Sequence, residues 1–275
     1  MGAYNLERHA ASWGSPCQAG RLARGSLRVL ICVMDISSDT AEASCRVGPI
    51  RASFAPDMDR YEVSGVEKRR HEFLTGRSLA ENALCHMGCA DPFVGRHPDR
   101  SPIWPAGFCG SISHSDQLCA VMVGKTSALR SIGVDIEPQG AVPDGLRDTI
   151  YGPGDDPVGS DTTLIFAAKE AFYKMWYPLT GVFLDFPEVG ISVLGAQVTA
   201  RLLTSTAPLP PLQQIHGCVS HCQGHIMVVF ALEQAPGAQI RLYDQVSALC
   251  KTANAPPRDG KDKPPAAPGA HWITR

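Results

Sequence analysis

Residues 110–124 read Gly-Ser-Ile-Ser-His-Ser-Asp-Gln-Leu-Cys-Ala-Val-Met-Val-Gly, and this stretch predicts a β-hairpin. Its strands are expected at Gly110–His114 and Leu118–Gly124, joined across residues 115–117. A third strand is expected at Ser131–Ile136, and it stops at Pro138 because proline cannot donate a ladder hydrogen bond. The centre of the chain therefore favours antiparallel sheet structure.

The first half of the chain also shows a strand and a helix ahead of this hairpin. Leu27–Met34 is an apolar run of strand length. Glu67–His86 carries apolar residues at helical spacing, and an interruption is expected near Thr75 and Gly76 because glycine weakens a helix. Residues 1–25 lack periodicity, which indicates a loosely ordered N-terminal extension.

The second half repeats this plan after a linker at 139–159 that is rich in Pro, Gly and Asp. A helix is expected from a cap at Asp161 or Thr162 to about Tyr177. Weak strands are expected at Val189–Val193, Val198–Leu203 and His225–Leu232. The chain thus divides into a first half (26–138), a second half (160–250) and a disordered, Pro-rich tail (251–275), with helices and antiparallel strands of an α+β class in both halves.

The composition is that of an ordinary globular protein. Of 275 residues, 44% are hydrophobic and 19% charged, which excludes a wholly disordered or coiled-coil chain. The 25 Lys and Arg against 27 Asp and Glu give a net charge of −2, without the basic excess that nucleic-acid binding needs. No apolar run reaches membrane-spanning length and no signal peptide is evident, so we expect a cytoplasmic protein with its ten cysteines mostly reduced.

Two carboxylates lie two residues apart in the third expected strand, within Gly133-Val134-Asp135-Ile136-Glu137. Residues i and i+2 of a strand share a face, so Asp135 and Glu137 project together. Two carboxylates this close repel each other unless a cation or water separates them. Hard oxygen ligands of this kind suit Mg²⁺. For this triplet alone, a solvated strand end is the alternative interpretation.

The second expected helix carries Lys169-Glu170-Ala171-Phe172-Tyr173-Lys174. Glu170 and Lys174 are four residues apart, so their side chains point the same way. One interpretation makes Glu170 a third metal ligand or a base and Lys174 a phosphate contact. The other is an ordinary surface ion pair of little energetic weight.

Two further segments suit anion binding. Residues 104–114 read Trp-Pro-Ala-Gly-Phe-Cys-Gly-Ser-Ile-Ser-His, in which glycines allow backbone N–H groups to approach a phosphate and Ser113 and His114 add donors. A basic cluster on the first helix also suits phosphate recognition. It consists of Arg69, Arg70 and Arg77. A simple turn and a solvated helix face are the respective alternatives.

These four motifs, in this order, resemble the 4′-phosphopantetheinyl transferase superfamily. The likeness covers approximately residues 55–235. It rests on Glu67–Arg77, the Trp-Pro and Gly-Ser-Ile-Ser-His segment, Gly-Val-Asp-Ile-Glu, and Phe-Ala-Ala-Lys-Glu-Ala-Phe-Tyr-Lys. Within the superfamily, the motifs are most similar to the branch that contains the enterobactin synthetase component.

The resemblance implies transfer of the 4′-phosphopantetheine arm of coenzyme A to a serine of an apo carrier protein, with release of adenosine 3′,5′-bisphosphate. It also implies that Asp135, Glu137 and Glu170 hold Mg²⁺ on the diphosphate. Glu170 would in addition deprotonate the carrier serine, directly or through water. Lys174 would contact the diphosphate with support from Lys169. The adenosine end and 3′-phosphate would be bound by Arg69, Arg70, Arg77, Ser113 and His114.

The family fold implied by the resemblance is α+β, with two similar pseudo-symmetric halves, each a helix packed on a small antiparallel sheet. Coenzyme A would lie in the cleft between them, and a monomer is expected. The expected partners are apo carrier proteins or carrier domains of non-ribosomal peptide, polyketide or fatty-acid synthases. The enterobactin-like branch points to a siderophore pathway.

Two other classes of protein remain open. A zinc-binding module would use a Cys and His cluster whose spacing matches no usual zinc finger. That cluster consists of His216, Cys218, His221, Cys222 and His225, and Cys85-His86-x-x-Cys89 raises the same question. A non-catalytic coenzyme A- or carrier-binding protein is the other class, and the paired carboxylates argue against it because a pure binder has no use for them beside a diphosphate.

Overall fold

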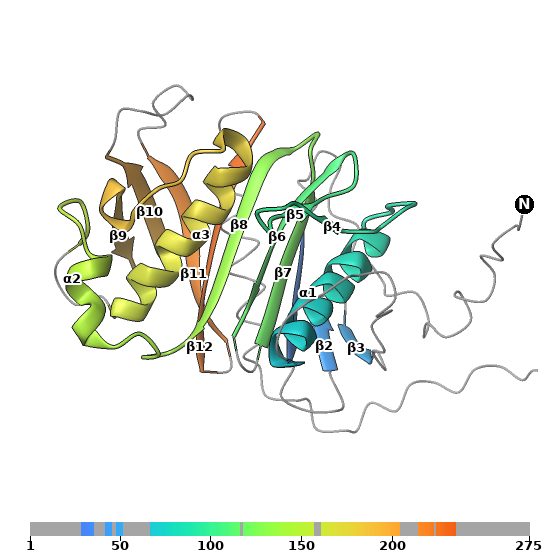
Figure 1. Ribbon diagram of the computed structural model, residues 1–275, viewed down its shortest axis with the longest axis horizontal. Helices are drawn as coiled ribbons and strands as arrows, with labels where there is room; N and C mark the ends of the chain where they lie inside the picture. Colours follow the sequence, from blue (N-terminus) through green and yellow to red (C-terminus); the bar gives the residue numbers. More distant parts are fainter. Residues whose placement is uncertain are drawn as a thin grey trace, which may run out of the picture.

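The computed structural model describes residues 29–35, 42–45, 48–51, 67–115, 118–156, 161–203, 214–222 and 224–234. Over these residues the chain forms two five-stranded antiparallel sheets and a two-stranded ribbon. Figure 1 shows the two sheets side by side, with one long helix in front of each. The expected α+β fold is confirmed.

The first sheet has the strand order β3-β2-β1-β7-β6. Strands β6 and β7 form the predicted hairpin, in which Ser113 lies opposite Ala120. The strands are β1 (Val29–Asp35), β2 (Glu42–Cys45), β3 (Gly48–Arg51), β6 (Phe108–His114) and β7 (Leu118–Lys125).

The second sheet has the order β8-β12-β11-β10-β9, so β8 lies at its edge beside the first sheet. In β8, Asp135 lies opposite Val228 of β12. The strands are β8 (Leu129–Pro138), β9 (Val189–Leu194), β10 (Gln197–Leu202), β11 (Ile215–Cys222) and β12 (His225–Glu233).

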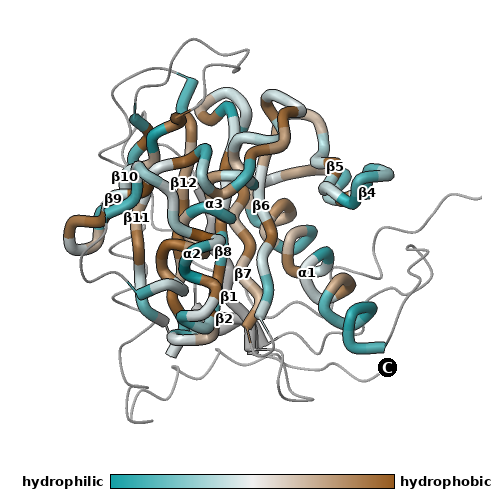
Figure 2. The backbone as a smooth tube through the Cα atoms, turned by 60° about the vertical axis from the view of Figure 1, so that its left-hand side comes forward, coloured by the Kyte–Doolittle hydropathy of each residue, from teal (hydrophilic) through white to brown (hydrophobic). Residues whose placement is uncertain are grey.

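Alternation along β7 divides its side chains between two cores. Cys119, Val121 and Val123 pack with apolar residues of helix α1 (Glu67–His86). The alternate residues pack with β8 and β12 of the second sheet. Hydrophobic stretches therefore recur along the central strands, whereas the first turn of α1 is hydrophilic (Figure 2). The two halves therefore share the core between β7 and the second sheet, whereas the core between β7 and α1 belongs to the first half.

Helix α1 is continuous, so the expected interruption near Thr75 and Gly76 is wrong. A Cβ atom at Gly76 would lie 2.8 Å from the Cγ2 atom of Ile112 in β6. Glycine therefore permits a close approach between helix and sheet at this position rather than breaking the helix.

Helix α3 (Thr162–Thr180) lies on β8 and begins at the predicted cap, where Asp161 accepts a hydrogen bond of 2.9 Å from the backbone N–H of Thr163. It ends three residues beyond the predicted end, because the N–H of Gly181, in the left-handed conformation, closes the last turn on the Tyr177 carbonyl. A side chain at Gly133 would collide with the Ala171 carbonyl oxygen. The missing side chain thus allows the Glu170–Lys174 turn to lie directly against β8.

Short elements complete the described structure. They are β4 (Gly95–Arg96) and β5 (Pro102–Ile103), which form the ribbon, the 3₁₀ turns η4 (Asp144–Leu146) and η5 (Phe186–Glu188), and helix α2 (Arg147–Ile150). No helix among the described residues is long and apolar enough to cross a membrane.

The structure departs from the expected organisation in two respects. Strands β2, β3, β4, β5 and β11 and helix α2 were not placed from the sequence. Strand β8 pairs with β12, so the sheets divide between β7 and β8, inside the range 26–138 that the sequence assigned to the first half. The expected N-terminal extension at 1–25 and the tail at 251–275 lie outside the described residues.

Candidate active site

Serine side chains on β6 join the two halves where no strand ladder does. Ser111 and Ser113 are two residues apart and face β8. The Ser111 hydroxyl accepts a hydrogen bond of 3.0 Å from the backbone N–H of Val134, and the Ser113 hydroxyl donates one of 2.7 Å to Oδ1 of Asp135. The floor of the junction between the halves is therefore polar.

Asp135, Lys174 and Ser113 form one hydrogen-bonded cluster at this junction. Nζ of Lys174 lies 2.6 Å from Oδ1 of Asp135 and 3.0 Å from Oγ of Ser113. The second carboxylate oxygen of Asp135, Oδ2, is buried and has no hydrogen-bond partner among the described residues. A buried carboxylate oxygen without a partner is costly and is typical of a place where a ligand or ion binds.

Glu170 belongs to the same electrostatic neighbourhood, one helical turn before Lys174. Burial raises the pKa of Glu170, the charge of Asp135 raises it further, and the charge of Lys174 lowers it. The ammonium group of Lys174 therefore interacts with both carboxylates. Because its pKa is raised, Glu170 binds a proton more readily than an ordinary glutamate does.

The donor set fits a hard divalent cation in part. Asp135 on β8 and Glu170 on α3 carry carboxylate oxygens of the kind that such an ion binds, and the unpartnered Oδ2 of Asp135 is the atom that an ion would satisfy. Glu137 follows on the same strand and is partly buried. In the described part of the chain, no three His, Cys, Asp or Glu side chains are grouped closely enough to hold a metal ion. The expected Asp135, Glu137 and Glu170 triad is thus not assembled in this arrangement.

His114, at the end of β6, lies beside this cluster. Its Nδ1 is 3.8 Å from Oε2 of Glu72 on α1. Partial desolvation lowers the pKa of the half-exposed His114, and the charge of Lys174 lowers it further, whereas the charges of Glu72 and Asp135 raise it. The structure therefore places His114 beside the acidic cluster and adds Glu72, which the sequence analysis missed.

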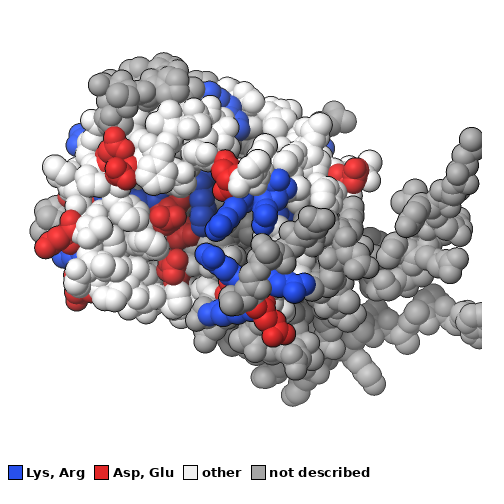
Figure 3. Space-filling view, in the orientation of Figure 1, with Lys and Arg blue, Asp and Glu red and all other residues white. Residues whose placement is uncertain are grey.

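Basic side chains gather on the α1 side of the junction. The guanidinium carbon of Arg77 lies 4.9 Å from the ring centre of Phe73, and that of Arg96 in β4 lies 5.7 Å from the same ring. Arg77 is buried, whereas Arg69 and Arg70 are exposed. Figure 3 shows acidic side chains over the centre of this face with basic side chains next to them toward α1. Arg96 was not among the predicted site residues.

Lys169 does not join the cluster, and the expectation that it supports the diphosphate needs correction. Its Nζ donates to the carbonyl oxygens of Ile150 and Phe186 at 2.8 and 2.7 Å and to Oδ2 of Asp155 at 2.6 Å. Both charged side chains of this pair are inaccessible to solvent. Lys169 thus anchors the segment around Asp155 to α3. Neighbouring helical residues diverge by about 100° around the axis, so Lys169 and Glu170 point in different directions.

Within the part of the chain that the structure describes, the cysteine and histidine residues considered for zinc are not grouped closely enough to hold a metal ion. Cys218 is buried, and Nδ1 of His216 lies 3.0 Å from the hydroxyl oxygen of Thr199. His225 is buried, with Nε2 lying 3.0 Å from Oγ of Ser115. His216 therefore contacts a neighbouring strand of its own sheet. His225 contacts Ser115 of the first half and forms another polar link between the halves.

Comparison with known families agrees with this geometry. A model of the 4′-phosphopantetheinyl transferase N-terminal domain matches residues 62–124, and one of the 4′-phosphopantetheinyl transferase superfamily matches residues 131–226. A 4′-phosphopantetheinyl transferase of Mycobacterium tuberculosis is 31% identical over 224 residues, which are 76% of this chain and 99% of the relative. The chain belongs to the 4′-phosphopantetheinyl transferase superfamily.

Other members of the superfamily match shorter stretches. A 4′-phosphopantetheinyl transferase of Nocardia iowensis is 36% identical over 50% of this chain and 65% of its own length. Enterobactin synthase component D of Salmonella typhi is 35% identical over 43% of this chain and 53% of its own length. The predicted family, including its enterobactin synthase branch, is therefore confirmed, and with it membership of a transferase family.

Proposed function

We propose that this protein transfers the 4′-phosphopantetheine group of coenzyme A to a serine hydroxyl of an apo carrier protein. The convergence of Asp135, Lys174 and Glu170 at the junction of the halves supports this proposal most directly. Two carboxylates and one ammonium group at a single place provide a base, a phosphate contact and cation ligands together.

The chemistry would be attack by the carrier serine oxygen on the phosphorus that bears the pantetheine arm. The bond from this phosphorus to the bridging oxygen breaks, and adenosine 3′,5′-bisphosphate leaves with the bond electrons. Glu170 would take the serine proton, directly or through water, because burial raises its pKa and so makes it a stronger base than an ordinary glutamate. Lys174 would donate hydrogen bonds to phosphate oxygens, moving from the Asp135 carboxylate that it now contacts.

Asp135 and Glu170, with Glu137 as the third candidate ligand, would hold Mg²⁺. The ion would supply neutralisation of the negative charge on the diphosphate. Ser113, which already bonds to Asp135, fixes the orientation of that carboxylate.

The 3′-phosphate and adenosine end of coenzyme A would lie toward α1. His114 and the basic cluster of Arg69, Arg70 and Arg77 supply the donors there, and Arg96 extends this cluster from β4. Arg77 is held by the Phe73 ring, so its guanidinium group is pre-positioned.

For the carrier, we propose peptidyl or aryl carrier domains of a siderophore-type non-ribosomal peptide synthetase, with the protein acting as a cytoplasmic monomer. The similarity to enterobactin synthase component D supports this choice. Carriers of polyketide or fatty-acid synthesis are the alternatives.

The test is to incubate the purified protein with coenzyme A, Mg²⁺ and a panel of apo carrier domains, and to record the intact mass of each carrier. We expect a mass gain of one phosphopantetheine group that disappears with EDTA and is fastest on the siderophore-type carriers. Coenzyme A binding with no gain on any carrier would favour a non-catalytic binding protein. Equal rates on all carriers would contradict the proposed siderophore-type carrier but would still support the transfer reaction.

A further inference from the structure

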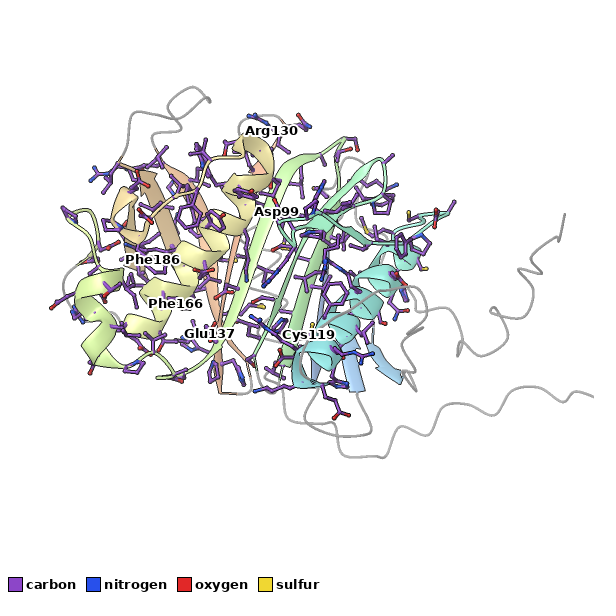
Figure 4. All side chains as sticks on the ribbon, in the orientation of Figure 1. Asp99, Cys119, Arg130, Glu137, Phe166 and Phe186 are labelled. Carbon is purple, nitrogen blue, oxygen red and sulfur yellow. The ribbon has the colours of Figure 1, made fainter. Side chains whose placement is uncertain are left out.

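Asp99 and Tyr177 join the two halves at a second place, away from the serine contacts on β6. The Tyr177 hydroxyl donates a hydrogen bond of 2.9 Å to Oδ2 of Asp99. Asp99 lies in the turn between β4 and β5, and Tyr177 lies in the last turn of α3. Figure 4 shows Asp99 between this ribbon and α3. The contact therefore links the β4–β5 ribbon directly to α3.

The ribbon side of this contact is firmly built. Asp99 Oδ1 accepts hydrogen bonds from the backbone N–H of Ser101 at 2.9 Å and from its hydroxyl at 2.7 Å. The backbone N–H of His97 donates to the Ser101 carbonyl at 2.9 Å, which closes the turn. Arg100 adopts a left-handed conformation with φ of 75°, which is uncommon for a residue with a side chain. Asp99 is thus presented toward α3 in a fixed orientation.

On α3, the residue that makes this contact lies close to the Asp135–Lys174 cluster in the sequence of the helix. Tyr177 follows Lys174 by three residues, so the two side chains lie on neighbouring positions of one helix face. The Tyr177 ring is 5.4 Å from the Tyr173 ring, which limits its movement. The hydroxyl that reaches Asp99 therefore comes from the turn beyond the proposed phosphate contact.

The ribbon also carries a cation. Arg96 precedes Asp99 by three residues and contacts the Phe73 ring of α1, which Arg77 contacts as well. The ribbon is consequently attached to α1 through Arg96 and to α3 through Asp99. Any displacement of the ribbon from α3 would move Arg96 relative to the other basic groups.

We propose that the Tyr177–Asp99 hydrogen bond is a clasp that holds the β4–β5 ribbon, and with it Arg96, in position to bind the phosphates of coenzyme A. Both residues are positioning residues, since they act through Arg96 and touch no reacting atom. The choice of coenzyme A as the ligand rests on the proposed function. The Tyr177–Asp99 hydrogen bond itself does not depend on that function.

The kinetic test compares Tyr177→Phe, Asp99→Asn and the double variant, with Tyr151→Phe and Asp91→Asn as controls that remove the same groups elsewhere. We expect each single variant to raise KM for coenzyme A roughly threefold to tenfold, as for loss of an ordinary solvent-exposed hydrogen bond. kcat should be unchanged, because the clasp is remote from the transferred phosphorus. The double variant should be no worse than either single variant.

A second readout does not depend on activity. The hydrogen bond and the charge of Asp99 both raise the pKa of Tyr177. Subtracting the ultraviolet titration of Tyr177→Phe from that of the parent isolates this phenol, at pH values where circular dichroism shows an intact fold. In Asp99→Asn the same phenol should titrate at lower pH.

Each outcome has a distinct meaning. An unchanged phenol titration in Asp99→Asn would overturn the clasp. A coupled titration with unchanged KM, or with additive effects in the double variant, would overturn its role in coenzyme binding. If the parent shows the coupled titration but neither binds coenzyme A nor modifies a carrier, the proposed function fails and the positioning role fails with it, while the clasp stands.

Discussion

Nζ of Lys174 lies 2.6 Å from Oδ1 of Asp135, and the aspartate side chain is almost completely buried while the lysine is 29% exposed. The other oxygen of Asp135 has no hydrogen-bond partner in the described structure. In the coenzyme-free protein, the lysine therefore neutralises a carboxylate that is otherwise arranged to bind a cation. The carboxylate is thus neutralised on one side and lacks a hydrogen-bond partner on the other.

Lys174→Ala should destabilise the metal-free protein by about 1–3 kcal/mol, between the values for exposed and buried ion pairs, because it leaves Asp135 uncompensated. A divalent cation should then replace the lost charge, so Mg²⁺ should raise the Tm of Lys174→Ala more than that of the parent. Calorimetry with and without Mg²⁺ measures both effects. Lys125→Ala, at the exposed end of β7, is the control, and an equal Mg²⁺ response in all three proteins would contradict the assignment.

Glu170→Gln should lose transfer activity by about 100-fold or more if Glu170 is the base. The same variant should be more stable at neutral pH. Burial and Asp135 raise the pKa of Glu170, so the folded protein binds this proton more tightly than the unfolded chain does. Ionised Glu170 therefore costs stability once the pH exceeds its folded pKa.

The difference in Tm between Glu170→Gln and the parent should accordingly grow as the pH rises from below the ordinary glutamate value of 4.5. Thermal unfolding across this range, without metal, measures it, and Glu67→Gln in the exposed first turn of α1 is the matched control. A Tm difference that is independent of pH would disprove the raised pKa.

Lys169→Met should lower the free energy of unfolding by about 3–5 kcal/mol, because it leaves Asp155 as an unpaired buried charge. Lys169→Met combined with Asp155→Asn should recover part of this loss. Chemical denaturation measures the stabilities, and transfer assays well below the Tm separate stability from catalysis. If folded Lys169→Met loses kcat as completely as Glu170→Gln, our structural assignment of Lys169 is incorrect.

Arg69→Ala and His114→Ala should weaken coenzyme A binding several-fold with little change in Tm, because both side chains are exposed. Arg77→Ala should weaken binding and also lower the Tm, since Arg77 is buried against Phe73. Calorimetric titration with coenzyme A and with its 3′-dephospho form assigns the contacts. Equal losses for both ligands would place these residues away from the 3′-phosphate.

The elements with a clear period were predictable from the sequence. The β6–β7 hairpin, the start of α3 and most of β8 follow from alternation, a cap and a proline. Strand β11 was not placed because its mixture of Cys, His and Gly lacks the regular apolar and polar alternation that marks a strand. Gly76 was taken for a break because only the folded structure shows that Ile112 packs against it.

Several site residues depend on contacts between distant segments and had no local signal. Glu72, Arg96 and Asp99 acquire their roles from His114, Phe73 and Tyr177 respectively. The mistaken role of Lys169 has a different origin. Its neighbour Glu170 made it look like part of one motif, although successive helical residues point in different directions.

The most direct test of the central claim measures the rate at which an apo carrier gains one phosphopantetheine group, by intact mass, for the parent and for Asp135→Asn. Both proteins should first be shown to be folded at the assay temperature. Our account predicts rapid modification by the parent with Mg²⁺ and a loss of about 100-fold or more in Asp135→Asn. Equal rates for the two folded proteins would contradict the assignment of this cluster as the site of transfer.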